Sequence, residues 1–261
     1  MGLAALVVLG VGGLLLRGGS EGAASICDVR QLCGVAGELP HEVKAAAGWP
    51  ARPARGTVIV LHGGGWRHDV GDPRLLAGMA ADARRFRQRG FHTVNTSYRP
   101  GAAGYSDVRR VYREVGRRTH ARPGLLGASA GGHLALVLAS EERPAFAISM
   151  GGPTDLPTLP APLVRGWAED AFGRRGLLRW SPSRRRMRVP VLLAHNRGDR
   201  LVPVTQTRVV EEAEVALLDG LPRPRPRPGL RAWSGHGTVS TESLSRYHKV
   251  EAGFVDRQIR P

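Results

Sequence analysis

Residues 125–132 read Leu-Leu-Gly-Ala-Ser-Ala-Gly-Gly and join two patterns of different periodicity. The apolar residues 125–128 are typical of a short buried strand, and residues 132–140, rich in Ala and Leu, are typical of a helix. Between them Gly127-Ala128-Ser129-Ala130-Gly131 has the form Gly-X-Ser-X-Gly, in which a serine occupies a sharp strand-to-helix turn. The sequence therefore predicts Ser129 as a nucleophile. A second match at residues 18–22 follows no strand pattern, so Ser20 is not a candidate.

Strand and helix patterns alternate along the chain from about residue 56 onward. We expect strands at 57–61, 91–98, 125–128, 146–150, 189–194 and 230–233, and helices at 73–88, 106–118, 132–140 and 241–259. Asp107 would then lie in the first turn of its helix, where a carboxylate suits the helix dipole. This alternation predicts an α/β fold with a mostly parallel central sheet flanked by helices. Residues 157–188 are longer than a simple crossover requires, so we expect a small cap insertion there.

The glycine-rich motif His62-Gly63-Gly64-Gly65-Trp66 directly follows the first of these strands. Three successive glycines allow backbone N–H groups to turn inward, where they can stabilise a developing oxyanion. We expect this oxyanion hole to consist of the amides of Gly63, Gly64 and Ala130. The loop lacks the lysine and Ser/Thr that follow the glycines of a phosphate-binding P-loop. Trp66, together with Trp167 and Trp180 of the cap, is expected to contact the substrate.

A carboxylate is needed to orient the base that activates a serine. Asp199 lies just past the strand at 189–194 and is the expected carboxylate. Asp155, in Gly-Pro-Thr-Asp-Leu at 152–156, is the main alternative, and Asp170 and Asp219 are weaker ones.

The expected base is His236, which lies between two glycines after the predicted last strand and before the closing helix. A loop of this kind can project an imidazole over the edge of the sheet, where it can take the proton of Ser129. His195, His248 and His62 are the alternatives. The resulting chain order of Ser, Asp and His is the order found in α/β-hydrolases.

The ionisable residues give the chain a net charge of +16. Only Lys44 and Lys249 among the 38 basic residues are lysines, and the arginines are spread along the chain with few aromatics between them. This pattern does not favour a nucleic-acid partner, although binding to anionic cell-envelope polymers stays open. The run Pro-Arg-Pro-Arg-Pro-Arg-Pro at 222–228 is expected to be a stiff connector, with an anionic or SH3-like partner as the alternative. No metal-ligand motif or nucleotide-binding motif is present in the sequence, so no cofactor is expected.

The amino-terminal residues differ in composition from the rest of the chain. Residues 2–16 are apolar and uncharged, Arg17 ends the run, and small residues precede Ser25. We expect residues 1–24 to be a signal peptide or a membrane anchor, followed by a segment 25–55 and a hydrolase domain 56–261. Cys27 and Cys33 can close a small disulfide loop, which agrees with export. The expected location is therefore outside the cell or in its envelope, with the cytoplasm as the alternative.

These motifs together resemble a known family. The Gly-rich loop at 62–66, Tyr-Arg-Pro at 98–100, the serine motif at 127–132, residues 152–156 and Gly-Asp-Arg-Leu-Val-Pro at 198–203 look like the HGGG-type carboxylesterases of the α/β-hydrolase fold. Within this group they are most similar to the small esterase/lipase-like and feruloyl-esterase-like branch, over residues 56–259. The resemblance implies cofactor-independent hydrolysis of small carboxylic esters through Ser129, Asp199 and His236. An amidase, an arylformamidase or a peptidase with the same triad is the alternative, and a non-catalytic binding protein on this fold is a further one.

Overall fold

A computed structural model describes residues 26–28, 44–48, 54–67, 79–160, 162–210, 213–219, 236 and 241–259. The expectations for residues 1–24, for Cys33, for the proline-arginine run and for a strand at 230–233 concern residues outside these ranges.

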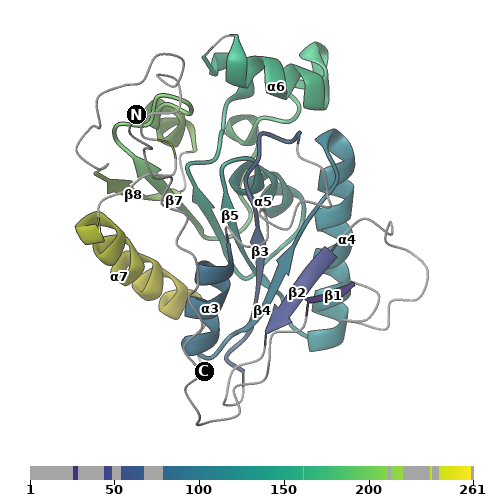
Figure 1. Cartoon of the computed structure of the whole chain (residues 1–261), viewed down its shortest axis with the longest axis vertical. Coiled ribbons are helices and arrows are strands. Elements are labelled where there is room, and N and C mark those ends of the chain that lie inside the picture. The colour runs from purple at the N-terminus through teal and green to yellow at the C-terminus, as the bar shows by residue number, and fades with distance from the viewer. Residues whose placement is uncertain are drawn as a thin grey trace, which may run out of the picture.

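The core of the described fold is a single twisted sheet with strand order β1-β2-β4-β3-β5-β6-β7-β8 (Figure 1). The six strands from β4 to β8 in this order are parallel, while β1 and β2 pair antiparallel at one edge. The strands are β1 Ile26–Asp28, β2 Lys44–Gly48, β3 Thr57–Leu61, β4 His92–Thr96, β5 Gly124–Ala128, β6 Ala147–Met150, β7 Val191–Asn196 and β8 Ala213–Leu218. The predicted mostly parallel sheet is confirmed.

Helices cover both faces of this sheet, because consecutive residues of its central strands are apolar and point to opposite faces (Figure 1). On β3, Val58 and Val60 face one side, where they pack with α3 and α7. Ile59 and Leu61 face the other side, where they pack with α4 and α5. The helices are α3 Ala80–Gln88, α4 Gly101–Thr119, α5 Ala130–Glu141, α6 Leu163–Phe172 and α7 Thr241–Gln258.

The sheet contains three strands that the sequence patterns did not indicate. The edge strand β8 pairs with β7 and buries only Ala216 and Leu218, so its apolar signal is weak. The other two are β1 and β2; the latter reads Lys-Ala-Ala-Ala-Gly and has none of the β-branched residues that favour strands.

Helix α4 begins earlier than expected, directly after Pro100, and this changes the role of Asp107. The expectation that Asp107 lies in the first turn is wrong. Its buried carboxylate instead accepts hydrogen bonds from the backbone and guanidinium of Arg99, the latter at 2.7 and 2.9 Å. Asp107 therefore fixes the turn between β4 and α4 rather than complementing the helix dipole.

The segment between β6 and β7 contains α6 and three short 3-10 helices, η1 Leu156–Thr158, η2 Arg174–Gly176 and η3 Pro182–Arg184. A fourth, η4 Val204–Val209, lies between β7 and β8. Figure 1 shows α6 beyond the end of the sheet at which β5 finishes. This places α6 above the residues that follow the parallel strands. Over the described part of the chain, no helix combines the length and apolar character needed to cross a membrane.

Candidate active site

Ser129 occupies a strained turn between β5 and α5. Its backbone has φ 51° and ψ −119°, a conformation that costs a residue with a side chain of the order of 1–3 kcal/mol. The N–H of Ser129 donates to the carbonyl of Met150 at 2.8 Å, so the neighbouring strand β6 holds the turn in place. The turn presents the side chain at the carboxyl end of β5, as the Gly-X-Ser-X-Gly pattern predicted.

Two glycines make this tight turn possible. A Cβ atom on Gly127 would overlap the carbonyl oxygen of Gly131, since strand and helix cross there without space for a side chain. A Cβ atom on Gly131 would overlap the carbonyl oxygen of His62. The serine turn and the glycine-rich loop are therefore packed directly against each other.

His236 joins Ser129 to Asp199 through two hydrogen bonds. Its Nε2 lies 2.9 Å from the hydroxyl oxygen of Ser129, and its Nδ1 lies 2.8 Å from Oδ2 of Asp199. The carboxylate can only accept, so the proton is on Nδ1 and Nε2 is left to accept the hydroxyl proton. The structure thus brings together the three residues selected from the sequence, in the arrangement that general-base activation of a serine requires.

Asp199 is held rigidly for this role. Its Oδ1 accepts hydrogen bonds from the backbone N–H groups of Leu201 and Val202, at 2.9 and 3.0 Å. Its side chain is 2% exposed. One carboxylate oxygen is therefore occupied by the backbone, which leaves the other to orient the imidazole of His236.

The alternative bases lie elsewhere. His195 is buried, and its Nε2–H donates to the carbonyl of Val202 at 2.8 Å. Burial lowers the pKa of His195, which favours its neutral form beside Asp199. His62 stacks on Tyr98 with ring centres 4.2 Å apart, and His248 lies on α7. Among the described residues, the imidazole bonded to the hydroxyl of Ser129 is that of His236.

The alternative carboxylates are also accounted for. Asp155 is buried at the start of η1, where its backbone N–H donates to Gln206 at 2.7 Å. Asp170 is exposed on α6, and Asp219 pairs with Arg246 at 2.9 Å on the surface. Among the described residues, the carboxylate bonded to His236 is that of Asp199.

The glycine-rich loop passes beside the serine. A Cβ atom on Gly63 would lie 3.2 Å from Cβ of Ser129, and both Gly63 and Gly64 line the same pocket as Ser129. Ala130 is the first residue of α5, so its N–H is at the positive end of the helix dipole. The three amides selected from the sequence thus come from two segments that meet at Ser129.

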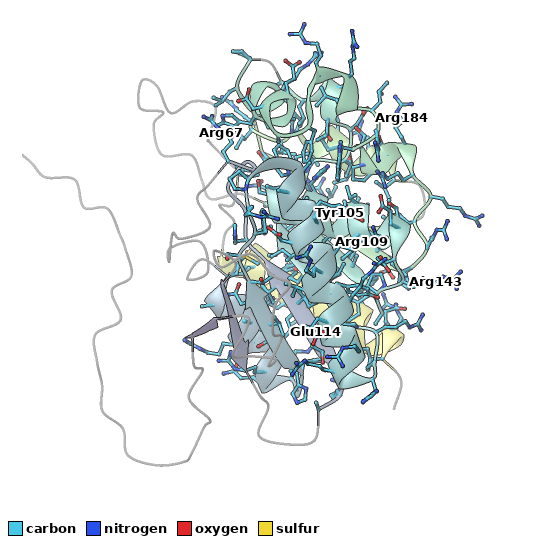
Figure 2. The ribbon with its side chains drawn as sticks, turned by 90° about the vertical axis from the view of Figure 1, so that its right-hand side faces the viewer. Arg67, Tyr105, Arg109, Glu114, Arg143 and Arg184 are labelled. Atoms are coloured by element: carbon cyan, nitrogen blue, oxygen red, sulfur yellow. The ribbon has the colours of Figure 1, made fainter. Side chains whose placement is uncertain are left out.

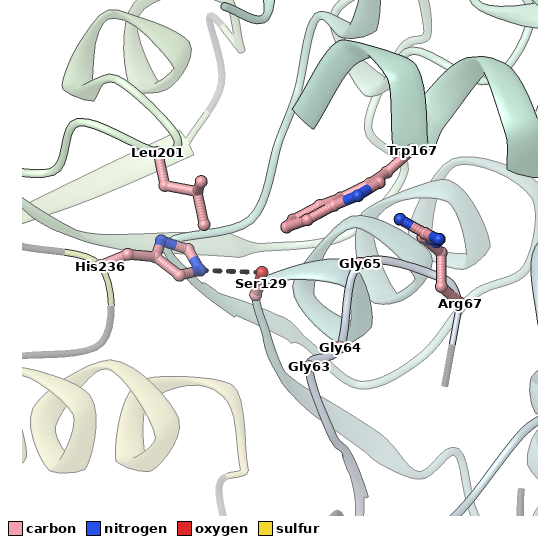
Figure 3. Close-up of a pocket in the computed structure, with 8 residues that line it drawn as sticks. All are labelled: Gly63, Gly64, Gly65, Arg67, Ser129, Trp167, Leu201 and His236. Atoms are coloured by element: carbon pink, nitrogen blue, oxygen red, sulfur yellow. Dashed lines mark hydrogen bonds between the residues drawn. The ribbon is translucent and has the colours of Figure 1, made fainter. Parts of the chain in front are cut away.

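A pocket of about 580 Å³ opens over Ser129 (Figure 3). Its described lining residues are Gly63, Gly64, Gly65, Arg67, Ser129, Trp167, Leu201 and His236. Trp167 reaches the pocket from α6, so this part of the cap forms one of its walls. The sequence did not indicate Arg67 or Leu201 as site residues, although Arg67 directly follows the motif at 62–66 and Leu201 lies inside the motif at 198–203.

Trp66 and Trp180, which are also expected to contact the substrate, are not among the described residues that line the pocket. Trp66 is buried, and its indole N–H donates to Nδ1 of His133 at 3.2 Å. Trp180 stacks on Phe172 and meets Tyr105 edge-on, with ring centres 4.9 and 5.2 Å apart. The Trp66 indole therefore packs within the core, and the partly buried Trp180 indole packs against it.

His133 connects the glycine-rich loop to the cap. Burial lowers its pKa to about 4, so the ring is neutral at pH 7. Its Nδ1 accepts from Trp66, and its Nε2–H donates to the carbonyl of Trp180 at 2.8 Å. One neutral imidazole on α5 therefore holds two segments that flank the pocket.

The described residues contain no cluster of three or more His, Cys, Asp or Glu side chains that could hold a metal ion.

The chain matches no protein-family model and no curated protein sequence. Its structure is similar to that of Thermogutta terrifontis esterase 2 phosphonylated by sarin, with a TM-score of 0.70 and 17% identity over 95% of this chain and 100% of that one. The native form of that esterase has a TM-score of 0.62 and 18% identity, over 90% of this chain and 94% of that one.

A truncated carbohydrate esterase from gut microbiota is similar as well. Its TM-score is 0.65 at 16% identity, over 86% of this chain and 94% of that one. Since these similarities extend over most of each chain, they identify the architecture. At 16–18% identity they do not identify the substrate. The chain has the α/β-hydrolase fold.

Proposed function

We propose that this protein is a serine hydrolase that cleaves carboxylic esters. Ser129 is the nucleophile, His236 is the general base and acid, and Asp199 orients the imidazole. The amides of Gly63, Gly64 and Ala130 form the oxyanion hole. The observation that carries the proposal is the hydrogen-bonded chain from Ser129 through His236 to the buried Asp199, at the base of an open pocket.

The first half of the reaction forms an acyl-enzyme. Oγ of Ser129 attacks the ester carbonyl carbon while Nε2 of His236 takes the hydroxyl proton. The carbonyl oxygen becomes an oxyanion that accepts hydrogen bonds from the three amides, each such donor being worth about 100- to 1000-fold in rate. The C–O bond to the alcohol then breaks, and His236 returns the proton to the departing alkoxide.

The second half releases the acid. Water enters where the alcohol left, His236 removes its proton, and the resulting hydroxide attacks the acyl carbon. The second tetrahedral intermediate collapses, the Ser129 oxygen leaves, and His236 reprotonates it. Asp199 stabilises the imidazolium in both halves without taking the proton itself.

The similar structures support an ester substrate. They are structures of an esterase phosphonylated by sarin or phosphorylated by paraoxon, and of a carbohydrate esterase. Organophosphates of this type react with an activated nucleophile, and the arrangement around Ser129 supplies one here.

Hydrolysis of p-nitrophenyl acetate, butyrate and octanoate by wild type, Ser129→Ala and Ser106→Ala tests this proposal. Ser106 is exposed on α4, so its variant is a matched control for the loss of a hydroxyl. We expect turnover by wild type and Ser106→Ala and none above background by Ser129→Ala. Equal turnover by both variants would refute the assignment of Ser129 as the nucleophile.

The same proteins assayed on p-nitroanilides and methyl ferulate distinguish neighbouring activities. Turnover of anilides without turnover of esters would replace the esterase by an amidase. Turnover of methyl ferulate above that of the p-nitrophenyl esters would place the activity with the feruloyl esterases.

A further inference from the structure

Arg67 brings a positive charge into the pocket of Ser129. It directly follows the glycine-rich motif, and its backbone N–H donates to the carbonyl of Gly64 at 3.3 Å. Its guanidinium carbon lies 5.9 Å from the centre of the Trp167 ring. A guanidinium at this distance over an indole is attracted to the ring face, so Trp167 helps to hold Arg67 at the pocket wall.

The charge lies on a defined side of the nucleophile. Figure 3 shows Arg67 and Trp167 on one side of Ser129, and His236 and Leu201 on the other. His236 protonates the departing alcohol in the proposed reaction, so the alcohol leaves on the side of His236 and Leu201. The acyl part then extends toward Trp167 and Arg67.

Among the described residues, the pocket supplies no counter-charge for this arginine. Its described lining residues include no Asp or Glu, and no ion pair links Arg67 to a described carboxylate. Other arginines of the fold differ, for example Arg109 and Arg113, which both pair with Glu142 at 2.7 Å. Figure 2 shows Arg109 along α4, well apart from Arg67. Arg67 is therefore a cation whose partner can be a ligand.

We propose that Arg67 binds a carboxylate at the far end of the acyl group, so that the preferred substrates are monoesters of dicarboxylic acids. This inference rests on the proposed ester hydrolysis. The planar guanidinium offers two parallel N–H donors that match the two oxygens of a carboxylate. Trp167 provides an apolar wall for the methylene groups between the carboxylate and the ester. The net charge of +16 also attracts such anions to the protein.

The test compares two esters of equal chain length, 4-methylumbelliferyl hydrogen adipate and 4-methylumbelliferyl hexanoate. We expect wild type to favour the adipate, and Arg67→Gln to lower the adipate-to-hexanoate ratio of kcat/KM by about tenfold or more. The loss should come from KM for the adipate, and any fall in kcat/KM for the hexanoate should be smaller than the fall for the adipate. Arg67→Lys keeps the positive charge but lacks the two parallel N–H donors, so it should retain part of the preference for the adipate.

A matched control separates binding in the pocket from the general attraction of anions. Arg84 is exposed on α3, so Arg84→Gln removes the same charge far from the pocket. This variant should keep the wild-type ratio. An unchanged ratio in Arg67→Gln, or an equal fall in both variants, would overturn the proposal.

Binding without turnover keeps this test separate from that of the proposed function. Calorimetric titration of monomethyl adipate and methyl hexanoate into Ser129→Ala and into Ser129→Ala/Arg67→Gln requires no catalysis, and only the first of these ligands carries a carboxylate. We expect monomethyl adipate to bind at least about tenfold more weakly when Arg67 is replaced, and methyl hexanoate to lose less affinity. If monomethyl adipate binds in this way but no ester is turned over, the proposed reaction alone is refuted. If it binds equally to both variants, the role of Arg67 alone is refuted.

Discussion

The imidazole of His236 and the carboxylate of Asp199 lie 2.8 Å apart although they are 37 residues apart in the chain. Asp199 is placed by the end of β7 and by the backbone amides of Leu201 and Val202. His236 reaches it from a different segment and also contacts Ser129. Each of the three residues thus depends on a separate part of the fold, and the site is complete only when these parts are folded together.

Removing the charge of Asp199 should abolish most activity. In Asp199→Asn the amide no longer stabilises the imidazolium of His236 and favours the wrong tautomer, so kcat should fall by about 10³- to 10⁴-fold. Steady-state hydrolysis of p-nitrophenyl acetate measures this, with circular dichroism to check folding. The exposed Asp170 provides the control, and Asp170→Asn should keep wild-type kcat. A fall of less than tenfold in Asp199→Asn would contradict the role of this carboxylate.

Replacing two different glycines by alanine should have opposite effects on the free energy of unfolding. A Cβ atom on Gly131 would overlap the carbonyl oxygen of His62, so Gly131→Ala should lower the free energy of unfolding by more than about 2 kcal/mol. A Cβ atom on Gly166, within α6, would meet nothing within 4 Å. Gly166→Ala should therefore raise stability by about 0.5–1 kcal/mol. Urea denaturation checks both, and similar midpoints for the two variants would count against this packing.

His133 should make stability depend on pH. Its pKa is about 4 in the folded protein, below the ordinary value of 6.5, because burial disfavours the charged ring. Between these values the unfolded chain binds a proton that the folded protein does not, so stability decreases as pH falls from 6.5 toward 4. From pH 7 to pH 5 this amounts to about 2 kcal/mol.

The variant His133→Gln removes this contribution. Its unfolding free energy, measured in urea at pH 7 and pH 5, should decrease by about 2 kcal/mol less than that of wild type over the same interval. Burial lowers the pKa of His195 as well, but that effect is the same in both proteins. If the two proteins lost equal stability, His133 would not be held neutral by burial.

Trp167 and Trp180 should differ in their effect on substrate preference. Trp167 lines the pocket, so Trp167→Ala removes apolar surface from the acyl side and should reduce kcat/KM for p-nitrophenyl octanoate by about 10-fold or more relative to the acetate. Trp180 packs against Phe172 and Tyr105, and Trp180→Phe should leave the octanoate-to-acetate ratio unchanged. A change in this ratio in Trp180→Phe alone would reverse the assignment of the two residues.

Much of the sheet could be predicted because its central strands carry strong local signals. The bounds of β3 are those expected from its β-branched run, and β5 and α5 begin and end within two residues of their expected positions. The edge strands were missed for a physical reason. β8 is half exposed, with Glu214 and Val215 facing solvent, and an edge strand needs less apolar sequence than a central one.

The candidate site was predictable where a residue's role depends on the local backbone. Glycines 127 and 131 mark the turn at Ser129, and a Gly-His-Gly loop marked His236. The walls of the pocket were not predictable from the sequence, since they depend on which side chains the cap brings to Ser129. Trp66 and Trp180 carry no sequence signal that distinguishes them from Trp167, and only tertiary packing separates them. Arg67 was overlooked among many arginines for the same reason.

The most direct test of the proposed reaction is covalent labelling with a fluorophosphonate followed by peptide mass spectrometry. An organophosphorus centre captures a serine only when an adjacent base activates it. We expect a single adduct on Ser129 in wild type, none in Ser129→Ala, and a loss of ester hydrolysis in proportion to the labelling of Ser129. An adduct on another residue, or hydrolysis that persists once Ser129 is fully labelled, would contradict the proposed reaction.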